Sequence, residues 1–288
     1  MVAVAAAAAV ALVSSCSPVT QRGWLPTGEG TTDQTDGIVQ LWTGSWIAAL
    51  IVGVIVWGLI IWCVVVYRKR KDDHQLPVQL RYHLPLELLY TFVPILMVGV
   101  LFFYTVRTQD SITEVDTDET DVRIQVYGRQ WSWDFNYLDY DVWDTGQPAD
   151  LNDISSDTEE GLAQYWAQDD VPTLVLPVGQ TVEFTLNSRD VIHSFWIPAF
   201  LYKIDTTPGR TNTFQVTPQV QGSYYGRCAE LCGEYHGYML FNVEVVSQEE
   251  FEQHMADLAA AGQNGVLGED LDRSVAPEDP DFGEEEDH

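Results

Sequence analysis

The sequence predicts a two-helix transmembrane hairpin followed by an all-β Greek-key sandwich. Two long apolar runs occupy the first third of the chain, a basic loop separates them, and short alternating strands follow. The 288 residues are 46% hydrophobic, which is enough apolar surface to form a sizeable core. The 43 acids and 14 Lys and Arg give a net charge of −29, which repels phosphate and excludes nucleic-acid binding. The same charge favours a basic partner.

The first fifteen residues form an apolar run that ends in small residues, as in an export signal. Val13-Ser14-Ser15-Cys16 resembles a bacterial lipobox, in which Cys16 would carry the lipid. Because no Lys or Arg precedes the apolar run, a signal peptide with an incidental cysteine stays open. Residues 16–40 would then form an external N-terminal segment.

The two apolar runs, residues 41–67 and 84–106, each exceed the ~20 residues that cross a bilayer. Buried core helices are the alternative. The loop between them, residues 68–83, holds five of the 14 basic residues, and the positive-inside rule makes such a loop cytoplasmic. Both termini and the acidic C-terminal half would then lie on the extracytoplasmic side of a bacterial plasma membrane.

Glu87 is the single acid in the second run and lies near its start. Ionisable groups at membrane depth are costly and often functional, so Glu87 is a candidate for a proton path. The alternative is a carboxylate that reaches water at the interface.

After a linker at 107–121, the chain shows strand patterning from 122 to 247. Alternating residues and turn signals predict strands at 122–126, 173–178, 180–187, 211–216 and 241–246. Short strands separated by turns indicate a Greek-key sandwich or barrel. Residues 137–170 hold ten acids and no Lys or Arg, so we expect a surface insertion there. Residues 248–288 should form a short helix, starting near 247, and then an acidic disordered tail from 264.

A cluster of metal-ligand residue types lies near the end of the strand region. Cys228, Cys232, His236 and Met239 follow one another closely, and His193 lies upstream. Such soft and borderline ligands select copper over calcium or magnesium. One cysteine would suit a mononuclear site, whereas two allow both sulfurs to bridge two coppers. A disulfide and a zinc site remain the alternatives.

Three motifs together resemble one family. They are C-A-E-L-C-G-E-Y-H-G-Y-M at 228–239, D-V-I-H-S-F-W-I-P at 190–198 and G-R-Q-W-S-W-D-F at 128–135. The chain resembles subunit II of cytochrome c oxidase, the haem-copper oxidase subunit that carries the dinuclear copper centre CuA. The resemblance covers most of the chain and implies a cupredoxin fold for the external domain.

The resemblance implies a role for each matching residue. Cys228 and Cys232 would bridge the two coppers, and the site would be completed by His193, His236, Met239 and the backbone carbonyl of Glu230. The Glu230 carboxylate would help to bind Mg²⁺ at the contact with subunit I, since carboxylate oxygen suits that hard cation.

Two further residues gain roles from the resemblance. Trp131 matches the tryptophan through which electrons enter the family's copper centre. Glu87 matches the acid at the mouth of the proton path called the K channel, although this chain has Tyr90 where the family usually has Trp.

The function implied is that of subunit II of a proton-pumping aa3-type cytochrome c oxidase. It would pass electrons from cytochrome c to the haem of subunit I, where oxygen is reduced to water. This chain has no C-x-x-C-H haem motif, so we expect no haem in it. The alternatives are a copper-free subunit II of a quinol oxidase and another CuA electron-transfer protein.

The lipobox, the acidic insertion and the acidic tail resemble oxidases of high-GC Gram-positive bacteria. The expected partners are therefore subunits I and III, membrane lipid, and cytochrome c. In such bacteria the donor is often a membrane-tethered dihaem cytochrome c of a bc complex.

Overall fold

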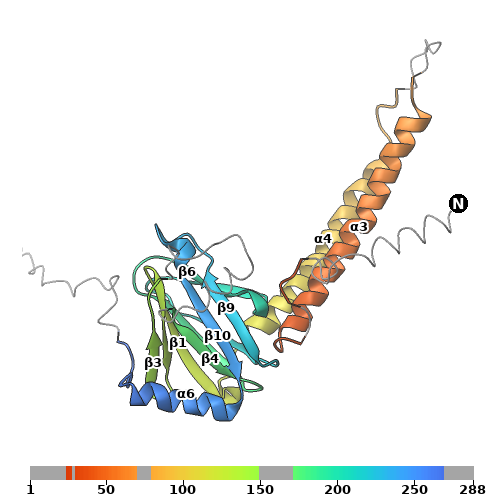
Figure 1. Cartoon of the computed structure of the whole chain (residues 1–288). Helices are drawn as coiled ribbons and strands as arrows, with labels where there is room; N and C mark the ends of the chain where they lie inside the picture. The colour runs from red at the N-terminus through yellow and green to blue at the C-terminus, as the bar shows by residue number, and fades with distance from the viewer. Residues whose placement is uncertain (1–23, 28–29, 70–78, 149–170, 269–288) are drawn as a thin grey trace, which may run out of the picture. The chain divides into compact units, whose positions relative to one another are not determined.

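The computed structural model describes residues 24–27, 30–69, 79–148 and 171–268 (Figure 1). The predicted signal peptide, Cys16, part of the basic loop and most of the acidic tail lie outside the described residues. The chain divides into two compact units. One contains residues 37–111, and the other contains residues 25–36 and the chain from 112 onward.

Two long helices account for most of the described residues of the first unit. α3 spans Thr35–Val66 and α4 spans Leu84–Thr113, and both are long and apolar enough to cross a membrane. Most of their apolar side chains are exposed, as surfaces that face lipid would be. α3 begins before residue 41 and α4 continues past residue 106, so each helix is longer than its apolar run.

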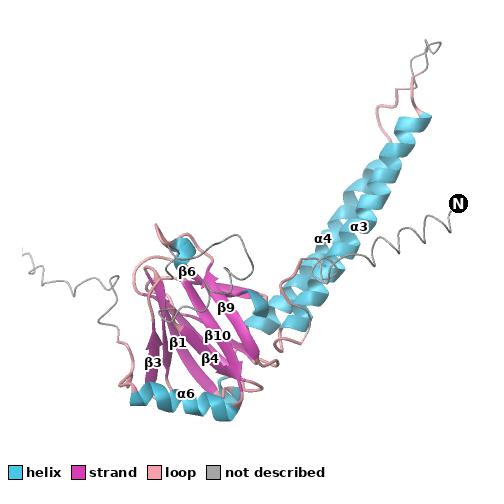
Figure 2. Cartoon of the chain, in the orientation of Figure 1, coloured by secondary structure: helices cyan, strands magenta, loops and turns pink. Residues whose placement is uncertain are grey.

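The second unit is a β-sandwich (Figure 2). Its two sheets have five strands each, in the orders β3-β2-β1-β5-β8 and β4-β10-β9-β6-β7. The pairs β1–β5 and β4–β10 are parallel, and the other pairs are antiparallel. The strands are β1 (Val122–Arg129), β2 (Ser132–Tyr137), β3 (Val142–Thr145), β4 (Thr173–Pro177), β5 (Val182–Ser188), β6 (His193–Ile197), β7 (Tyr202–Thr206), β8 (Asn212–Val216), β9 (Gly222–Cys228) and β10 (Leu240–Val246). Three short 3₁₀ helices accompany them: η1 (Thr117–Glu119), η2 (Pro198–Phe200) and η3 (His236–Tyr238).

Aromatic rings fill the space between the sheets. Phe195 and Phe241 stack with centroids 4.9 Å apart, and Trp133 meets each of them edge-on. Gly226 on β9 lies under the Phe241 ring, and a Cβ there would come within 1.9 Å of the ring. The glycine therefore makes room for the core of the sandwich.

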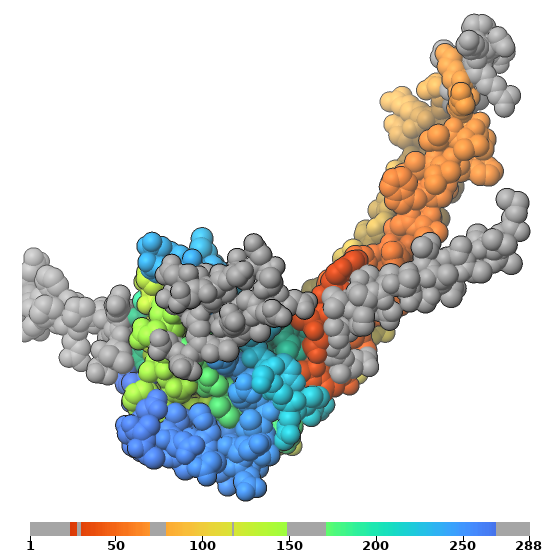
Figure 3. Space-filling view, in the orientation of Figure 1, coloured from red at the N-terminus to blue at the C-terminus, as the bar shows by residue number. Residues whose placement is uncertain are grey.

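One helix covers an end of the sandwich. α6 (Gln248–Ala260) starts at a capping box between Ser247 and Glu250, and it buries Phe251, Met255 and Leu258. In the space-filling view it lies, in blue, against the yellow-green surface of the first sheet (Figure 3). The structure thus confirms the helix that the sequence predicts near residues 247–261.

The chain crosses from β3 in one sheet to β4 in the other. The Asp144 carboxylate, on β3, accepts hydrogen bonds from the backbone N–H groups of Thr173 (3.0 Å) and Thr145 (2.9 Å). It therefore joins the two ends of the crossover that contains the acidic insertion.

The structure corrects three sequence expectations. The predicted insertion starts too early, because Tyr137 is buried at the end of β2 and residues 142–145 form β3. His193 begins strand β6, which is not among the strands that the sequence predicts. The tail is ordered further than expected, since the Leu267 N–H donates to the Asn136 side chain (3.0 Å).

Candidate metal centre

The candidate ligands meet at one end of the second sheet. β6 begins with His193 and β9 ends with Cys228, and these two strands pair with Phe195 opposite Cys228. The chain then makes a loop, residues 229–239, before it returns as β10. The loop carries the other predicted ligands, Cys232, His236 and Met239. Strand pairing thus joins two motifs that are far apart in the sequence.

The two cysteine sulfurs lie side by side at the centre of this cluster. Their Sγ atoms are 3.8 Å apart, and both thiols are free and buried. A disulfide needs a sulfur–sulfur distance of about 2.05 Å, so this structure has no disulfide here.

Each sulfur has its own imidazole. His193 Nδ1 lies 3.9 Å from the Cys228 sulfur, and His236 Nδ1 lies 3.6 Å from the Cys232 sulfur. The Met239 thioether lies 3.8 Å from the Cys232 sulfur, and the Glu230 carbonyl oxygen lies 3.2 Å from the Cys228 sulfur. The structure therefore brings together every residue that the sequence predicted for the copper site.

The two thiols affect each other's charge. A hydrogen bond from Cys232 stabilises the Cys228 thiolate and lowers the pKa of Cys228, and the same contact raises the pKa of Cys232. Two negative sulfurs at this distance repel each other unless a cation lies between them. A metal that binds both must therefore displace the proton the pair retains.

The first imidazole is held by a carboxylate that the sequence analysis did not select as a site residue. His193 Nε2 lies 2.7 Å from Asp190 Oδ1, which leaves Nδ1 directed at Cys228. Burial opposes a charged imidazole, but the Asp190 hydrogen bond raises the pKa of His193. The D-V-I-H motif contains Asp190, three residues before His193, so the signal was present in the sequence.

The His193 ring also packs against the backbone of β1. A Cβ on Gly128 would lie 2.9 Å from His193 Cδ2 and 3.0 Å from the Thr206 hydroxyl oxygen. Glycine at this position therefore lets the β1 backbone pack closely against the His193 ring.

Trp131 lies at the tight turn between β1 and β2, beside the ligand loop. Its indole Nε1 donates to the Cys232 carbonyl oxygen at 3.2 Å, and its ring meets Tyr235 edge-on at 4.9 Å. The preceding side chain, Gln130, donates from Nε2 to the same carbonyl at 2.8 Å. A partly buried tryptophan is thus joined to a predicted ligand by one hydrogen bond.

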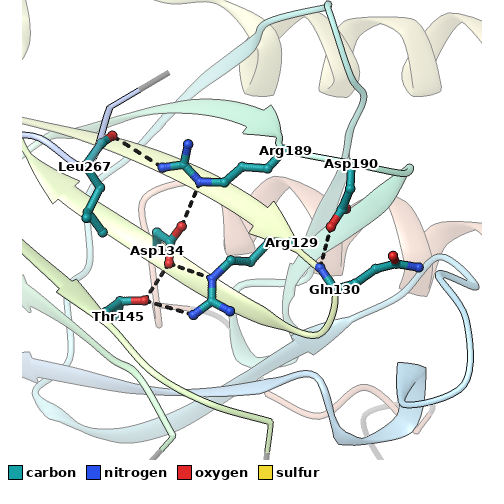
Figure 4. Close-up of a pocket in the computed structure, with 7 residues that line it drawn as sticks. All are labelled: Arg129, Gln130, Asp134, Thr145, Arg189, Asp190 and Leu267. Carbon is teal, nitrogen blue, oxygen red and sulfur yellow. Dashed lines mark hydrogen bonds and ion pairs between the residues drawn. The ribbon is translucent and has the colours of Figure 1, made fainter. Parts of the chain in front are cut away.

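A buried ion cluster borders the site (Figure 4). Asp134 on β2 accepts hydrogen bonds from Arg189 Nε (2.8 Å) and Arg129 Nε (2.9 Å). Arg189 also donates to the carbonyls of Leu267 and Gly268. These groups line a cavity of about 410 Å³ that Asp190 and Gln130 also border. Hydrogen bonds therefore join Leu267 and Gly268, in the C-terminal segment, to Arg189, which directly precedes Asp190.

Two residues outside the ligand set, Glu87 and Cys16, also have roles predicted from the sequence. Glu87 is in the first turn of α4, where its Oε1 accepts a hydrogen bond from the His83 backbone N–H at 3.0 Å. The Leu86 N–H donates to the His83 ring at 3.3 Å, so the two side chains cap the helix. Cys16 lies outside the described residues.

The donor set fits copper. Donor atoms of His193, Cys228 and Cys232 lie within 4.8 Å of one another, and all three residues are buried. Thiolate, imidazole and thioether are the ligands that copper sites use. Two adjacent sulfurs, each with an imidazole on its own side, match what a pair of sulfur-bridged metals requires.

The chain is similar to proteins of one kind. The family model described as cytochrome c oxidase subunit II, periplasmic domain, matches residues 122–246. The probable cytochrome c oxidase subunit 2 of Streptomyces coelicolor is 44% identical over 255 residues, which cover 82% of this chain and 80% of that protein. Cytochrome c oxidase subunit 2 of Mycobacterium tuberculosis is 36% identical over 286 residues, covering 84% and 77%.

A solved structure is also similar. The periplasmic domain of subunit II of cytochrome oxidase of Bradyrhizobium japonicum is 29% identical and covers 49% of this chain and 96% of its own, with a TM-score of 0.40.

Proposed function

The chain belongs to the cytochrome c oxidase subunit II family and is a membrane-bound subunit of a haem-copper oxidase, and we propose that electrons enter the oxidase through it. The donor would be a cytochrome c, and the acceptor would be the haem of subunit I in a proton-pumping aa3-type enzyme. The observation that carries this proposal is the pair of cysteine sulfurs 3.8 Å apart, each beside its own imidazole.

The bound group in this proposal is a dinuclear copper centre. Its chemistry would be to accept and release one electron that the two metals share. Cys228 and Cys232 would bridge the metals, and His193, His236, Met239 and the Glu230 carbonyl would complete the ligand set. The chain's own part is to hold these groups in fixed places, so that little moves when the charge changes.

The Glu230 side chain has a second proposed role. Its carbonyl faces the Cys228 sulfur while the residue itself is exposed, so one residue can serve two neighbours. The carboxylate would bind Mg²⁺ at the contact with subunit I, because hard cations prefer oxygen ligands.

Trp131 is the proposed point at which electrons enter. Its ring is partly exposed, so a docked donor can reach it, and its indole N–H bonds the carbonyl of Cys232. Trp133, in contrast, is fully buried in the core. The exposure of Trp131 and its hydrogen bond to a ligand residue support this choice.

Glu87 is proposed as the proton-path entrance at the cytoplasmic end of α4. Its place in the first helical turn supports this, since that end follows the basic loop. The observed hydrogen bond to His83 also serves the helix start, so a capping role accompanies the proposed one.

The proposed location is a bacterial plasma membrane, with both termini and the sandwich outside and Cys16 lipidated. Subunits I and III would be the membrane partners. The net charge of −29 would speed the arrival of a basic cytochrome c domain, whether soluble or tethered to a bc complex. Donor oxidation that slows steeply as salt rises would support docking by charge.

Two alternatives predict different sites. A copper-free subunit of a quinol oxidase has no use for two free buried thiols next to two imidazoles. A soluble CuA protein of another kind has no use for two apolar helices of membrane-spanning length. The observed combination favours the oxidase subunit.

The test is copper content and electron paramagnetic resonance of the purified full chain loaded with copper. We expect two coppers per chain and a seven-line hyperfine pattern, because one unpaired electron is shared by two copper nuclei. Cys228→Ser should remove this pattern. A folded chain that takes up no copper, or one copper with a four-line pattern, would contradict the dinuclear site.

A further inference from the structure

One carbonyl beside the candidate copper site accepts two hydrogen bonds from consecutive residues. The Cys232 oxygen receives Gln130 Nε2 at 2.8 Å and Trp131 Nε1 at 3.2 Å. The hydrogen bond from the Gln130 side chain is the shorter of the two. Each side chain donates one N–H to this carbonyl, so Gln130 makes the closer of the two polar contacts between this turn and the ligand loop.

Gln130 is also held from the opposite side. Its backbone N–H donates to Asp190 Oδ2 at 2.7 Å (Figure 4). The other oxygen of Asp190 lies 2.7 Å from His193 Nε2. Gln130 therefore links Asp190, which holds His193, to the carbonyl group of Cys232. The turn that carries Trp131 is thus fixed to both halves of the ligand set.

The ligand loop is shaped to receive this turn. Gly233 has φ +124°, and a Cβ there would lie 3.1 Å from Trp131 Nε1 and 3.2 Å from Gln130 Nε2. The absence of a side chain lets both groups reach the Cys232 carbonyl. Tyr235 closes the other side of the indole with an edge contact.

We propose that Gln130 is the positioning residue for electron transfer into this subunit, because its amide sets the Trp131 ring against the copper-ligand loop. This inference rests on the proposed function. Gln130 is not one of the proposed copper ligands, and in this inference it acts through the placement of Trp131. Without the side-chain amide, the turn keeps its backbone bond to Asp190, but its hydrogen bonding to the Cys232 carbonyl falls to the longer indole bond. The Trp131 ring can then shift along the ligand loop.

The test uses the complete oxidase with Gln130→Met, which keeps the side-chain length and removes the donor. Laser-flash reduction by a ruthenium-labelled basic cytochrome c gives the rate of copper reduction and the later rate of haem reduction. We expect copper reduction to slow several-fold, because the electron-transfer rate depends on the distance and orientation of the Trp131 ring relative to the copper-ligand loop. Copper content, the paramagnetic spectrum and the copper-to-haem rate should stay unchanged.

Two variants control the experiment. Gln180→Met removes a similar amide, which donates to Gln248 just past the end of β10 that is opposite the ligand loop, and should leave both rates as in the wild type. Gln130→Glu keeps the shape of the side chain but presents a carboxylate to the carbonyl. It should slow copper reduction at least as much as Gln130→Met.

The outcomes separate this inference from the proposed function. A wild-type rate in Gln130→Met, with Trp131→Phe slow, would overturn the positioning role alone. A lost copper spectrum in both Gln130 variants would also overturn it, because the residue would then build the metal site itself. A wild-type rate in Trp131→Phe would remove the proposed route of electron transfer and this inference with it.

Discussion

The Asp190 carboxylate lies 2.7 Å from the Nε2 atom of His193 and directs the other ring nitrogen toward the Cys228 sulfur. A carboxylate behind a ligand imidazole fixes the tautomer and the ring orientation, and it makes the ligand more basic. The same carboxylate holds the turn that carries Trp131, through the Gln130 N–H. Ligand geometry and the proposed electron route therefore depend on one side chain.

Asp190→Asn should weaken copper binding by roughly 10- to 100-fold, the usual cost of removing such a partner. The amide still accepts a hydrogen bond but carries no charge to favour the donor imidazole. Competition with a copper chelator of known affinity measures the change. Asp257→Asn on α6 is the matched control and should bind copper as the wild type does. Equal affinities for the two variants would contradict the role of Asp190.

Asp134→Asn should destabilise the sandwich by roughly 3–5 kcal/mol, since removing one partner of a buried ion pair leaves uncompensated charge. Asp134 and Arg189 each have only 2% of their side-chain surface exposed. Thermal unfolding followed by near-ultraviolet circular dichroism measures the loss. The control is Asp139→Asn, which breaks a pair with the exposed Arg123 and should change stability little. Similar losses in both variants would mean that the buried ion pair contributes no more to the free energy of unfolding than the exposed pair does.

His254 should make the sandwich less stable in mild acid. Burial lowers the pKa of His254 below its usual 6.5, although the nearby Asp144 and Asp257 oppose this. As the pH falls through 6.5, the unfolded chain therefore binds a proton that the folded chain does not, and stability drops.

The variant His254→Leu isolates this effect from the other titrating groups. Nε2 of His254 has no hydrogen-bond partner among the described residues, so leucine leaves nothing newly unpaired. The melting temperature of the variant, relative to the wild type, should rise steadily from pH 7 to pH 5. A difference that does not change with pH would rule out titration of His254.

Gly128→Ala should distort the copper site, because the new methyl group would press on the His193 ring at 2.9 Å. We expect altered copper hyperfine splitting with a folded sandwich. Gly237→Ala is the control: it lies in the ligand loop, but its Cβ would meet no atom within 4 Å. A wild-type spectrum for Gly128→Ala would show that the imidazole can move without consequence.

The sequence predicted β1, β4, β5, β8 and β10 and missed β2, β3, β6, β7 and β9. Val122–Val126 alternates plainly and lies in β1, and the predicted 241–246 strand corresponds to β10. β2 alternates too, but polar Ser132, Asp134 and Asn136 are buried together with its aromatic residues. The C-terminal segment and two arginines cover that outer face. No local pattern reveals such a cover.

The site was predictable where chemistry alone identifies a residue. Thiols, imidazoles and a thioether at close spacing indicated the ligands, and the structure brings all of them together. The contacts of Gln130 were not predictable, since they exist only because the β1–β2 turn lies against a loop a hundred residues later. A single glutamine forms no sequence pattern that would indicate such a role.

The Asp144 carboxylate, which joins β3 to Thr173 at the start of β4, has a practical consequence for protein engineering. Because Asp144 fastens the end of β3 to the start of β4, we expect both strands to keep their registers when the length of chain between them is changed. Each doubling of such a segment costs only about 0.6 kcal/mol in closure entropy. An affinity tag or a fluorophore grafted there would report on the assembled oxidase while the copper ligands stay in place.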